Sequence, residues 1–256
     1  MNLSFNNIEV FAQVEMESEL VKHYFLDELK DRYDSNFIQF LKVPSLQQFK
    51  EVEQYLTEFH KAKGQTHVKF TFPQDEEIPN DVCNYVKNEA YAIGNLEMYA
   101  ISPKEFTYSY TCEEAIVEFV SEGTLPHYLA IHFEDAKQWG ESYAAGRKKM
   151  LTRDFLEQRK KQIIARIGEQ IVGSVDVIVK ADTAEIDNFY VLPAFQKRGI
   201  GTKIQQFIMD EFADKTIILV ADGEDTPRAM YAKQGYTYIG KQYNLLKTNI
   251  TEETIG

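Results

Sequence analysis

The 256-residue sequence has little cysteine, little proline and no long apolar run. Its two cysteines, Cys83 and Cys112, form no CxxC motif or Cys/His cluster, which argues against a disulfide framework and a zinc site. With 7 Pro and 13 Gly, the composition is not that of a disordered or collagen-like chain. No apolar run could span a membrane, and Met1 to Asn7 does not resemble a signal peptide, so we expect a cytoplasmic protein.

Positive charge is also scarce. The chain has 28 Lys and Arg against 40 Asp and Glu, a formal net charge of −12. Such a field is unfavourable for polyphosphate backbones and anionic membranes, so we expect neither nucleic acid nor a membrane as a partner. The histidines lack metal-ligand spacing, and we expect no metal: they are His23, His60, His67, His127 and His132.

The length suits two modest domains. Apolar residues recur at three and four from Leu46 to Lys63, and Ser45 with Gln48 has capping-box spacing, so this segment is predicted to be a helix. Strands are predicted at 68–72 and 96–101 and a short helix at 82–88. We place the boundary near residue 105, which gives an α+β domain at 1–105 and a second domain at 106–256.

The second domain is predicted to mix helices with a sheet. Thr111 has capping-box spacing and is expected to open an apolar helix that Gly123 ends. The later elements are expected in this order: helix-favouring stretch 134–161, hairpin 162–167 and 171–179, strand 184–191, helix from 200, buried strand 217–220, helix 226–234 and a strand pair within 236–246.

The turn from Gln196 to Gly201 lies between a strand and a helix, and its residue types suit a phosphate site. A helix N-terminus offers unpaired N–H groups and partial positive charge. Gly199 and Gly201 allow close approach to the backbone, while Lys197 and Arg198 add positive charge. The preceding hairpin excludes the opening βαβ unit of a dinucleotide fold, and Thr202 directly after Gly201 excludes a Walker motif. We interpret the turn as a pyrophosphate cradle.

Two motifs in this region resemble one family. The pattern Val191-x-Pro193-x-x-Gln196-x-x-Gly199-x-Gly201 resembles the acetyl-CoA motif of the GNAT N-acetyltransferases, and Met230 to Tyr236 resembles that family's tyrosine-lysine-glycine-aromatic segment. The resemblance covers about residues 111–246. It implies an α+β fold with a mixed sheet whose fourth and fifth strands splay apart. It also implies acetyl-CoA as the cosubstrate, held by these residues: Phe189, Val191, Gln196, Lys197, Arg198, Gly199, Ile200, Gly201 and Thr202.

Acetyl transfer to an amine needs a proton acceptor, because an alkylammonium with a pKa of about 10 is protonated at neutral pH. Glu185, eleven residues before Gln196, has the spacing of the basic glutamate in some similar family members. Asp187 or a chain of water molecules stays open as an alternative. An extended strand would place Glu185 and Asp187 on the same face as Phe189 and Val191.

Tyr231 resembles the family tyrosine that protonates the leaving thiolate, and a phenol suits that role at pH 7. The resemblance assigns the Phe189 N–H to the acyl carbonyl. One departure is that the family asparagine that contacts pantetheine is missing from Gly223 to Ala229. Asp225 or Thr226 is the candidate to replace it.

The first 105 residues contain a faint echo of the second domain. The segment Tyr91-Ala92-Ile93-Gly94 follows a helix and precedes a strand, as Tyr236 to Gly240 does. A degenerate copy of the GNAT fold and an unrelated α+β domain both stay open, with a role in shaping the acceptor cleft or the quaternary structure.

The leading prediction is a GNAT-type acyltransferase that moves acetyl from acetyl-CoA to a primary amine of a small molecule, peptide or protein by direct attack. A non-catalytic acyl-CoA-binding or sensing protein is the main alternative, and a structural interaction domain is the third. A homodimer is also open, and the sequence does not identify the acceptor.

Overall fold

The computed structural model describes residues 3–223 and 227–250, and the chain divides into two compact units. Unit 1 comprises Met1–Glu97, Asp222–Asp225 and Gly240–Gly256, and unit 2 comprises Met98–Ala221 and Thr226–Ile239. Two long strands, β5 (Ala92–Ile101) and β11 (Thr237–Thr248), contribute residues to both units. The sequence-based domain boundary near residue 105 stays a prediction.

Unit 1 is a sheet with helices. Its remaining elements are β1 (Gln13–Glu17), β2 (Val21–Phe25), β3 (Phe37–Phe40), α1 (Leu46–Ala62), β4 (His67–Thr71) and α2 (Asn80–Asn88), with 3-10 turns at Phe5–Asn7, Asp27–Leu29 and Tyr33–Ser35. The strands lie in the order β1-β2-β3-β4-β11-β5, and β3 with β4 is a parallel pair. The predicted capping box of α1 is confirmed, because Ser45 Oγ accepts the Gln48 N–H and Gln48 Oε1 accepts the Ser45 N–H.

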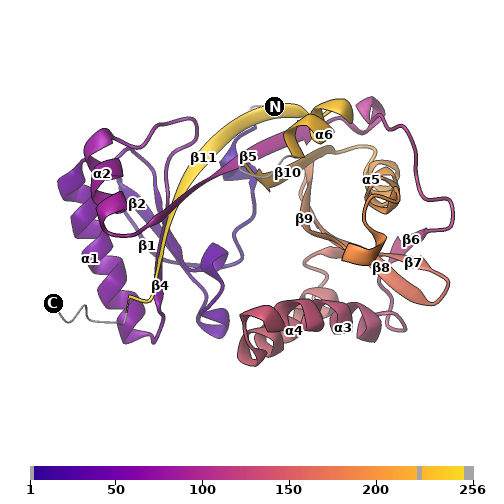
Figure 1. Ribbon diagram of the computed structural model, residues 1–256, viewed down its shortest axis with the longest axis horizontal. Coiled ribbons are helices and arrows are strands. Elements are labelled where there is room, and N and C mark those ends of the chain that lie inside the picture. Colours follow the sequence, from indigo (N-terminus) through magenta and orange to yellow (C-terminus); the bar gives the residue numbers. More distant parts are fainter. Residues whose placement is uncertain (1–2, 224–226, 251–256) are drawn as a thin grey trace. The chain divides into compact units, whose positions relative to one another are not determined.

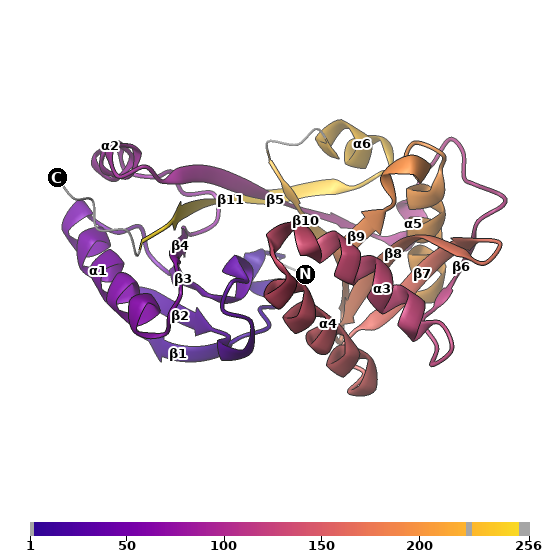
Figure 2. The same cartoon turned by 60° about the horizontal axis from the view of Figure 1, so that its bottom comes forward.

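Unit 2 is a mixed sheet with helices on both faces (Figures 1 and 2). Its elements are β6 (Ile116–Phe119), α3 (Leu125–Ala136), α4 (Glu141–Leu156), β7 (Lys161–Ile167), β8 (Gln170–Val179), β9 (Thr183–Val191), α5 (Ile200–Glu211), β10 (Thr216–Asp222) and α6 (Pro227–Lys233), with 3-10 turns at Pro103–Glu105, Lys137–Trp139 and Pro193–Phe195. The strands lie in the order β11-β5-β10-β9-β8-β7-β6, with β9 and β10 parallel. The predicted hairpin, the strand after it and the helix from Ile200 are confirmed.

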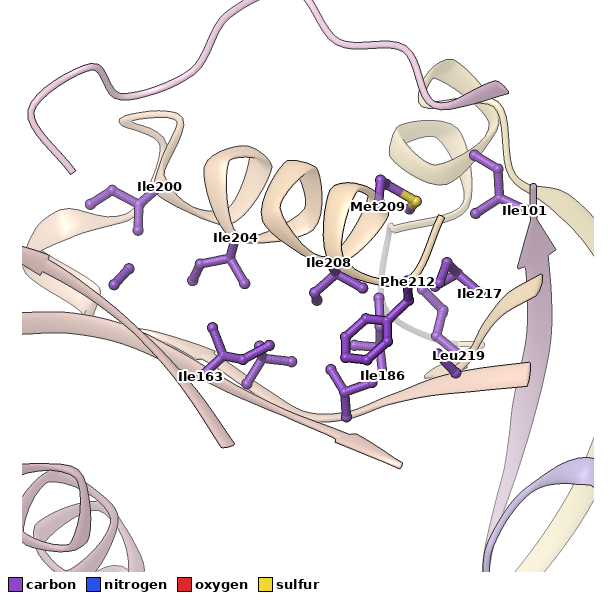
Figure 3. Packing of buried hydrophobic residues seen from close by; sticks show 14 of the residues in the cluster. Ile101, Ile163, Ile186, Ile200, Ile204, Ile208, Met209, Phe212, Ile217 and Leu219 are labelled. Carbon is purple, nitrogen blue, oxygen red and sulfur yellow. The ribbon is translucent and has the colours of Figure 1, made fainter. Parts of the chain in front are cut away.

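The two faces of this sheet carry different cores. Ile200, Ile204 and Ile208 of α5 point onto the strands, where they meet residues such as Ile163 and Ile186 (Figure 3). Burying each such side chain is worth roughly 1.5–3 kcal/mol. On the opposite face, α3 and α4 pack onto the sheet through a second cluster: Val120, Tyr128, Leu129, Leu151, Ile164 and Ile171.

Two predicted elements are wrong. The segment expected to be a helix after Thr111 contains β6, which pairs antiparallel with β7. Three of its four residues are β-branched or aromatic, and strand pairing overrides the weak capping signal. The final strand pair is one strand, β11. Gly240 lies inside this strand and not at a turn. The absence of a Cβ there leaves room for the side chains of Gln74 and Asp75.

The element order β3-α1-β4-α2-β5 in the N-terminal part of the chain recurs as β9-α5-β10-α6-β11 in the C-terminal part. The first two strands are parallel in both segments. Each second helix ends in the same way, since Ala90 and Gly235 have positive φ and the following tyrosine N–H bonds five residues back: Tyr91 to Val86 O and Tyr236 to Tyr231 O, both at 3.0 Å. We call these the N-terminal and C-terminal βαβαβ segments.

None of the helices within residues 3–223 and 227–250 has the length and apolar character needed to cross a bilayer.

Candidate active site

The predicted cradle is an open helix N-terminus. Gly199 is the N-cap of α5 in the left-handed region, with φ of +80°, and Lys197 has φ of +58°. Gly199 has no side chain to cap the helix, and no acidic residue lies in the first turn of α5. Within residues 3–223 and 227–250 no side chain caps the first N–H groups of α5, so the partial positive charge of the helix end stays available to an anion.

Gly199 is required at this turn for two reasons. Its positive φ disfavours L side chains, and an added Cβ would lie 2.9 Å from both the Cys112 nitrogen and the Thr111 carbonyl carbon. The same segment binds the turn through its backbone and side chains: Cys112 N–H donates to Gly199 O at 3.4 Å, and Tyr110 OH donates to Lys197 O at 3.2 Å. The turn is thus held from outside by residues that precede β6.

Gln196 joins the turn to the strand before it, because its Nε2 donates to Val191 O at 3.1 Å. Arg198 lies beside the turn, with its guanidinium 5.1 Å from the Phe195 ring centroid and 3.9 Å from a Glu114 oxygen. The Arg198 side chain is half exposed, so its charge can still reach a ligand.

Beside this turn the two parallel strands separate. The pairing of β9 with β10 runs from Thr183 and Thr216 to Ile186 and Leu219 and ends there, although both strands continue. Directly after this point β9 has a bulge: Asn188 has φ of +52°, and the pairing with β8 shifts between Ser174 and Asp176. The β9 backbone beyond Ile186 therefore lacks β10 as a ladder partner.

The bulge corrects the prediction that four β9 side chains share one face. Asp187 bonds to Lys160 on the face of α3 and α4, whereas Val191 packs against the α5 core. Phe189 also lies on the α5 side, since a Cβ on Gly201 would be 3.4 Å from its ring. The extra residue at Asn188 breaks the alternation of the strand, which sequence periodicity does not reveal.

The two candidate bases lie in different surroundings. Glu185 is buried in the strand, with a relative exposure of 6%, between Ile178 of β8 and Ile218 of β10. The Asp187 side chain is 30% exposed, and its Oδ2 lies 2.6 Å from Lys160 Nζ. Asp187 is therefore already engaged in an ion pair with Lys160.

A buried polar cluster surrounds the bulge, and the sequence reading did not find it. Asp176 on β8 is fully buried and accepts hydrogen bonds from Tyr128 OH at 2.6 Å and Asn188 Nδ2 at 3.3 Å. Arg147 Nη2 donates to Asn188 Oδ1 at 2.5 Å. Burial raises the pKa of the Asp176 carboxyl to about 6, against the opposing charge of Lys160.

Next to this cluster, His132 Nε2 lies 3.1 Å from Ser174 Oγ, and burial lowers the pKa of His132 to about 3, with the charges of Arg147 and Lys160 acting in the same direction. One sequence signal was available. Ser174 and Asp176 stand two residues apart in strand β8, among mainly apolar residues, which places two polar side chains on one face.

Tyr231, the predicted thiolate donor, lies on α6 and packs against the core of unit 2. Its ring centroid is 5.0 Å from that of Tyr99 and 5.3 Å from that of Tyr236. Burial raises the pKa of the Tyr231 phenol above 10, so the hydroxyl keeps its proton at neutral pH. The candidate pantetheine contacts Asp225 and Thr226 lie outside the described residues.

In the described part of the chain, no cluster of three or more His, Cys, Asp or Glu residues could hold a metal ion. The thiols of Cys83 and Cys112 are free.

Comparison with known proteins agrees with this geometry. Residues 158–238 match the family model of the acetyltransferase (GNAT) domain, and residues 3–99 match a domain of unknown function, DUF5613. No curated protein matches the chain.

Solved structures extend the similarity to nearly the whole chain. A conserved protein of unknown function from Staphylococcus epidermidis is 30% identical with a TM-score of 0.86, over 96% of this chain and 98% of that one. A GCN5-related N-acetyltransferase from Kribbella flavida is 12% identical with a TM-score of 0.64, over 92% and 89%. A tandem GNAT protein from the clavulanic acid biosynthesis pathway is 9% identical with a TM-score of 0.52, over 83% and 75%. The family match identifies a GNAT acetyltransferase domain within residues 158–238, and the solved structures show that the chain has the fold of the GCN5-related N-acetyltransferases.

Proposed function

We propose that the protein is an N-acetyltransferase that uses acetyl-CoA and acetylates a primary amine of a small molecule or protein by direct attack. One observation carries the proposal. The parallel strands β9 and β10 stop pairing after Ile186 and Leu219, in the same unit as the uncapped N-terminus of α5. A helix end that can bind a diphosphate and an unpaired strand that can bind an extended amide chain together suit coenzyme A.

The residues of this region fit acetyl-CoA, which supplies an acyl group activated as a thioester. The open N–H groups after Gly199, with Lys197 and Arg198, would hold the diphosphate. The β9 backbone at Phe189 and Val191 would pair with the pantetheine amides, because β10 does not pair with it there. In this arrangement the Phe189 N–H polarises the acyl carbonyl.

The faces of β9 suggest where the amine approaches. Phe189 and Val191 lie on the α5 face together with the cradle, while Asp187 lies on the face of α3 and α4. Glu185, two residues before Asp187 in regular strand, is on that second face as well. We assign Glu185 as the base that takes the ammonium proton, directly or through water, and we place the amine on this face.

Tyr231 is assigned as the group that returns a proton to the departing thiolate. The ordinary phenol pKa of about 10 already keeps Tyr231 neutral at physiological pH, and burial raises that pKa further, so the hydroxyl can donate. A protonated phenol beside the sulfur would also lower the barrier to thiolate release.

A panel of polyamines, aminoglycosides, amino acids and peptides, mixed with acetyl-CoA and followed by release of free thiol, tests the proposal. We expect turnover above the hydrolysis rate with at least one amine, a loss of at least tenfold in kcat for Glu185→Gln, and little change for the exposed control Glu169→Gln. Hydrolysis alone with every acceptor, despite tight acetyl-CoA binding, would contradict the transferase assignment.

A non-catalytic acyl-CoA-binding or sensing protein is the second candidate. It is favoured by the burial of Glu185 and by the ion pair of Asp187 with Lys160, because both features restrict a base. Acetyl-CoA binding that no amine alters, without turnover, would support it. The cytoplasmic location, the absence of nucleic-acid and membrane partners, and the homodimer stay predictions.

A further inference from the structure

The bulge of β9 is held by side chains from three other elements. Asn188 is in the left-handed region, which is uncommon for residues other than glycine but tolerated by asparagine. Its Oδ1 accepts from Arg147 of α4, and its Nδ2 donates to Asp176 of β8. Asp176 in turn accepts from Tyr128 of α3 at 2.6 Å. Asn188 thus links β9 directly to α4 and, through Asp176, to α3.

The residue before the bulge is held in the same way. Lys160 is buried, with its Nζ 2.6 Å from Asp187 Oδ2 and 3.9 Å from Asp176 Oδ2. Two cations and two carboxylates therefore meet around two consecutive residues of β9: Arg147, Lys160, Asp176 and Asp187.

Stability alone is a poor explanation for this cluster. Removing paired charges from water costs about as much as their attraction returns, and well-packed apolar residues often serve equally well. Left-handed backbone outside glycine costs on the order of 1–2 kcal/mol and persists only where the surroundings enforce it. The polar network that holds this backbone is therefore better explained by the geometry that it fixes than by the stability that it adds.

That geometry bears on the acyl group. The bulge moves Phe189 to the α5 face, the face of the open helix end, one residue after Asn188. A hydrogen-bond donor stabilises a developing oxyanion only if it is held in place before the reaction. An unbulged strand would keep the alternation, and Phe189 would remain on the face of Asp187.

We propose that Arg147 and Asn188 are positioning residues for acyl transfer: by bonding to each other they fix the left-handed bulge of β9 and so aim the Phe189 N–H at the acyl carbonyl. Neither residue lies in the motif that resembles the family pattern, and neither needs to touch the substrate. The inference rests on the proposed function.

Nuclear magnetic resonance of bound acetyl-CoA labelled with ¹³C at the thioester carbonyl tests it. In the wild-type protein the carbonyl resonance should move downfield from its position in free acetyl-CoA, because a hydrogen bond polarises the carbonyl. In Arg147→Met, and separately in Asn188→Gly, that shift should be lost. Asn188→Gly accepts the left-handed backbone without strain and removes only the two side-chain bonds, so it keeps the test usable if Arg147→Met unfolds.

Calorimetry with unacylated CoA accompanies the measurement. The Kd for CoA should rise by less than about tenfold, or 1.4 kcal/mol, in both variants, because the diphosphate seat at Gly199 is separate from the bulge and only the pantetheine pairing at Phe189 lies next to it. Lys149→Met, an exposed lysine of the same helix, is the matched control and should retain the carbonyl shift.

A carbonyl shift that persists in a folded Asn188→Gly variant would overturn the positioning role. Loss of CoA affinity by more than tenfold in that variant would overturn it as well, because the cluster would then merely support the fold. A wild-type protein that binds neither CoA nor acetyl-CoA would refute the proposed function itself, a result distinct from both.

Discussion

The helix after the first parallel strand begins differently in the two βαβαβ segments. In the C-terminal segment α5 starts at Gly199, with no side-chain cap. In the N-terminal segment the N-cap of α1 is Ser45, and its capping box with Gln48 occupies two N–H groups at the helix end, those of Ser45 and Gln48. Element order alone therefore does not create a diphosphate site. The first turn of the helix decides whether the site is open.

The second helix and the first strand of the two segments also differ, and again only the C-terminal segment has the feature that suits acyl transfer. Tyr231 lies five residues before Tyr236 in the C-terminal segment. The equivalent residue in the N-terminal segment, five residues before Tyr91, is Val86, so that segment has no phenol at this position. β9 has a bulge at Asn188, whereas β3 pairs with β2 without a register shift. The N-terminal segment keeps the packing of the C-terminal one, including a buried tyrosine whose hydroxyl bonds to the first helix: Tyr91 to Glu53 and Tyr236 to Gln205.

The two units are expected to differ most in their stability at acidic pH. Unit 1 buries His23, His60 and His67 completely, and burial lowers the pKa of His23 and His67 from 6.5 to about 4. Each then contributes stability that is present above pH 6.5 and is lost as pH falls towards 4, roughly 3 kcal/mol at about 1.4 kcal/mol per pH unit. In unit 2, His132 acts the same way, but Asp176 opposes it, because its raised pKa adds stability as pH falls below 6.

Hydrogen exchange resolved by peptide, at pH 7 and pH 4.5 after correction for intrinsic rates, measures this difference. Protection should fall much further in unit 1 than in unit 2. The exposed His127→Gln is the control and should change nothing. Equal loss of protection in both units would contradict the assignment to the buried histidines.

Two glycines with positive φ give the next largest contrast. Gly199→Ala should destabilise the protein by about 2–4 kcal/mol, through left-handed strain and overpacking against Thr111 and Cys112. It should also weaken acetyl-CoA binding at least tenfold. Gly64, with φ of +75° and no atom of the described residues within 4 Å of an added Cβ, is the matched site at the end of α1. Gly64→Ala should cost only about 1 kcal/mol and leave binding unchanged. Urea unfolding and calorimetry check both, and equal costs would refute the close contact at Gly199.

A smaller effect is expected when a tyrosine is replaced in each segment, and it concerns kcat. Tyr231→Phe should lower kcat with the best acceptor about 10- to 100-fold, equivalent to about 1.4–2.7 kcal/mol, because the thiolate loses its proton donor. Its Kd for acetyl-CoA should not change. Tyr85→Phe on α2 removes a phenol that bonds to Glu53 and is the control for turnover. Unchanged kcat in Tyr231→Phe would assign this residue to packing alone.

The smallest effect on stability is expected at the capped N-terminus of α1. Ser45→Ala removes half of the capping box and should lower stability by about 1 kcal/mol in urea unfolding. It should not create acetyl-CoA binding in unit 1, because Val86 and the regular β3 remain. A second mole of acetyl-CoA bound per chain of this variant would show that the cap alone had closed a site.

Sequence reasoning found the parts that depend on local signals. The capping box at Ser45, the hairpin of β7 and β8, and the turn at Gly199 each lie within a short segment with a clear residue pattern. It failed at β6 and β11, where pairing with distant strands decides the structure, and at Asn188, where one inserted residue reverses the strand's faces. Of the cluster of Arg147, Lys160 and Asp176, only Asp176 has a local sequence signal, because the three residues come together only in three dimensions.

Titration calorimetry of the wild-type protein with acetyl-CoA shows whether the C-terminal βαβαβ segment alone carries the cofactor site. We expect one molecule bound per chain, and binding at least tenfold weaker in Gly199→Ala but unchanged in Gly64→Ala. No binding at all, or two molecules bound per chain, would contradict it.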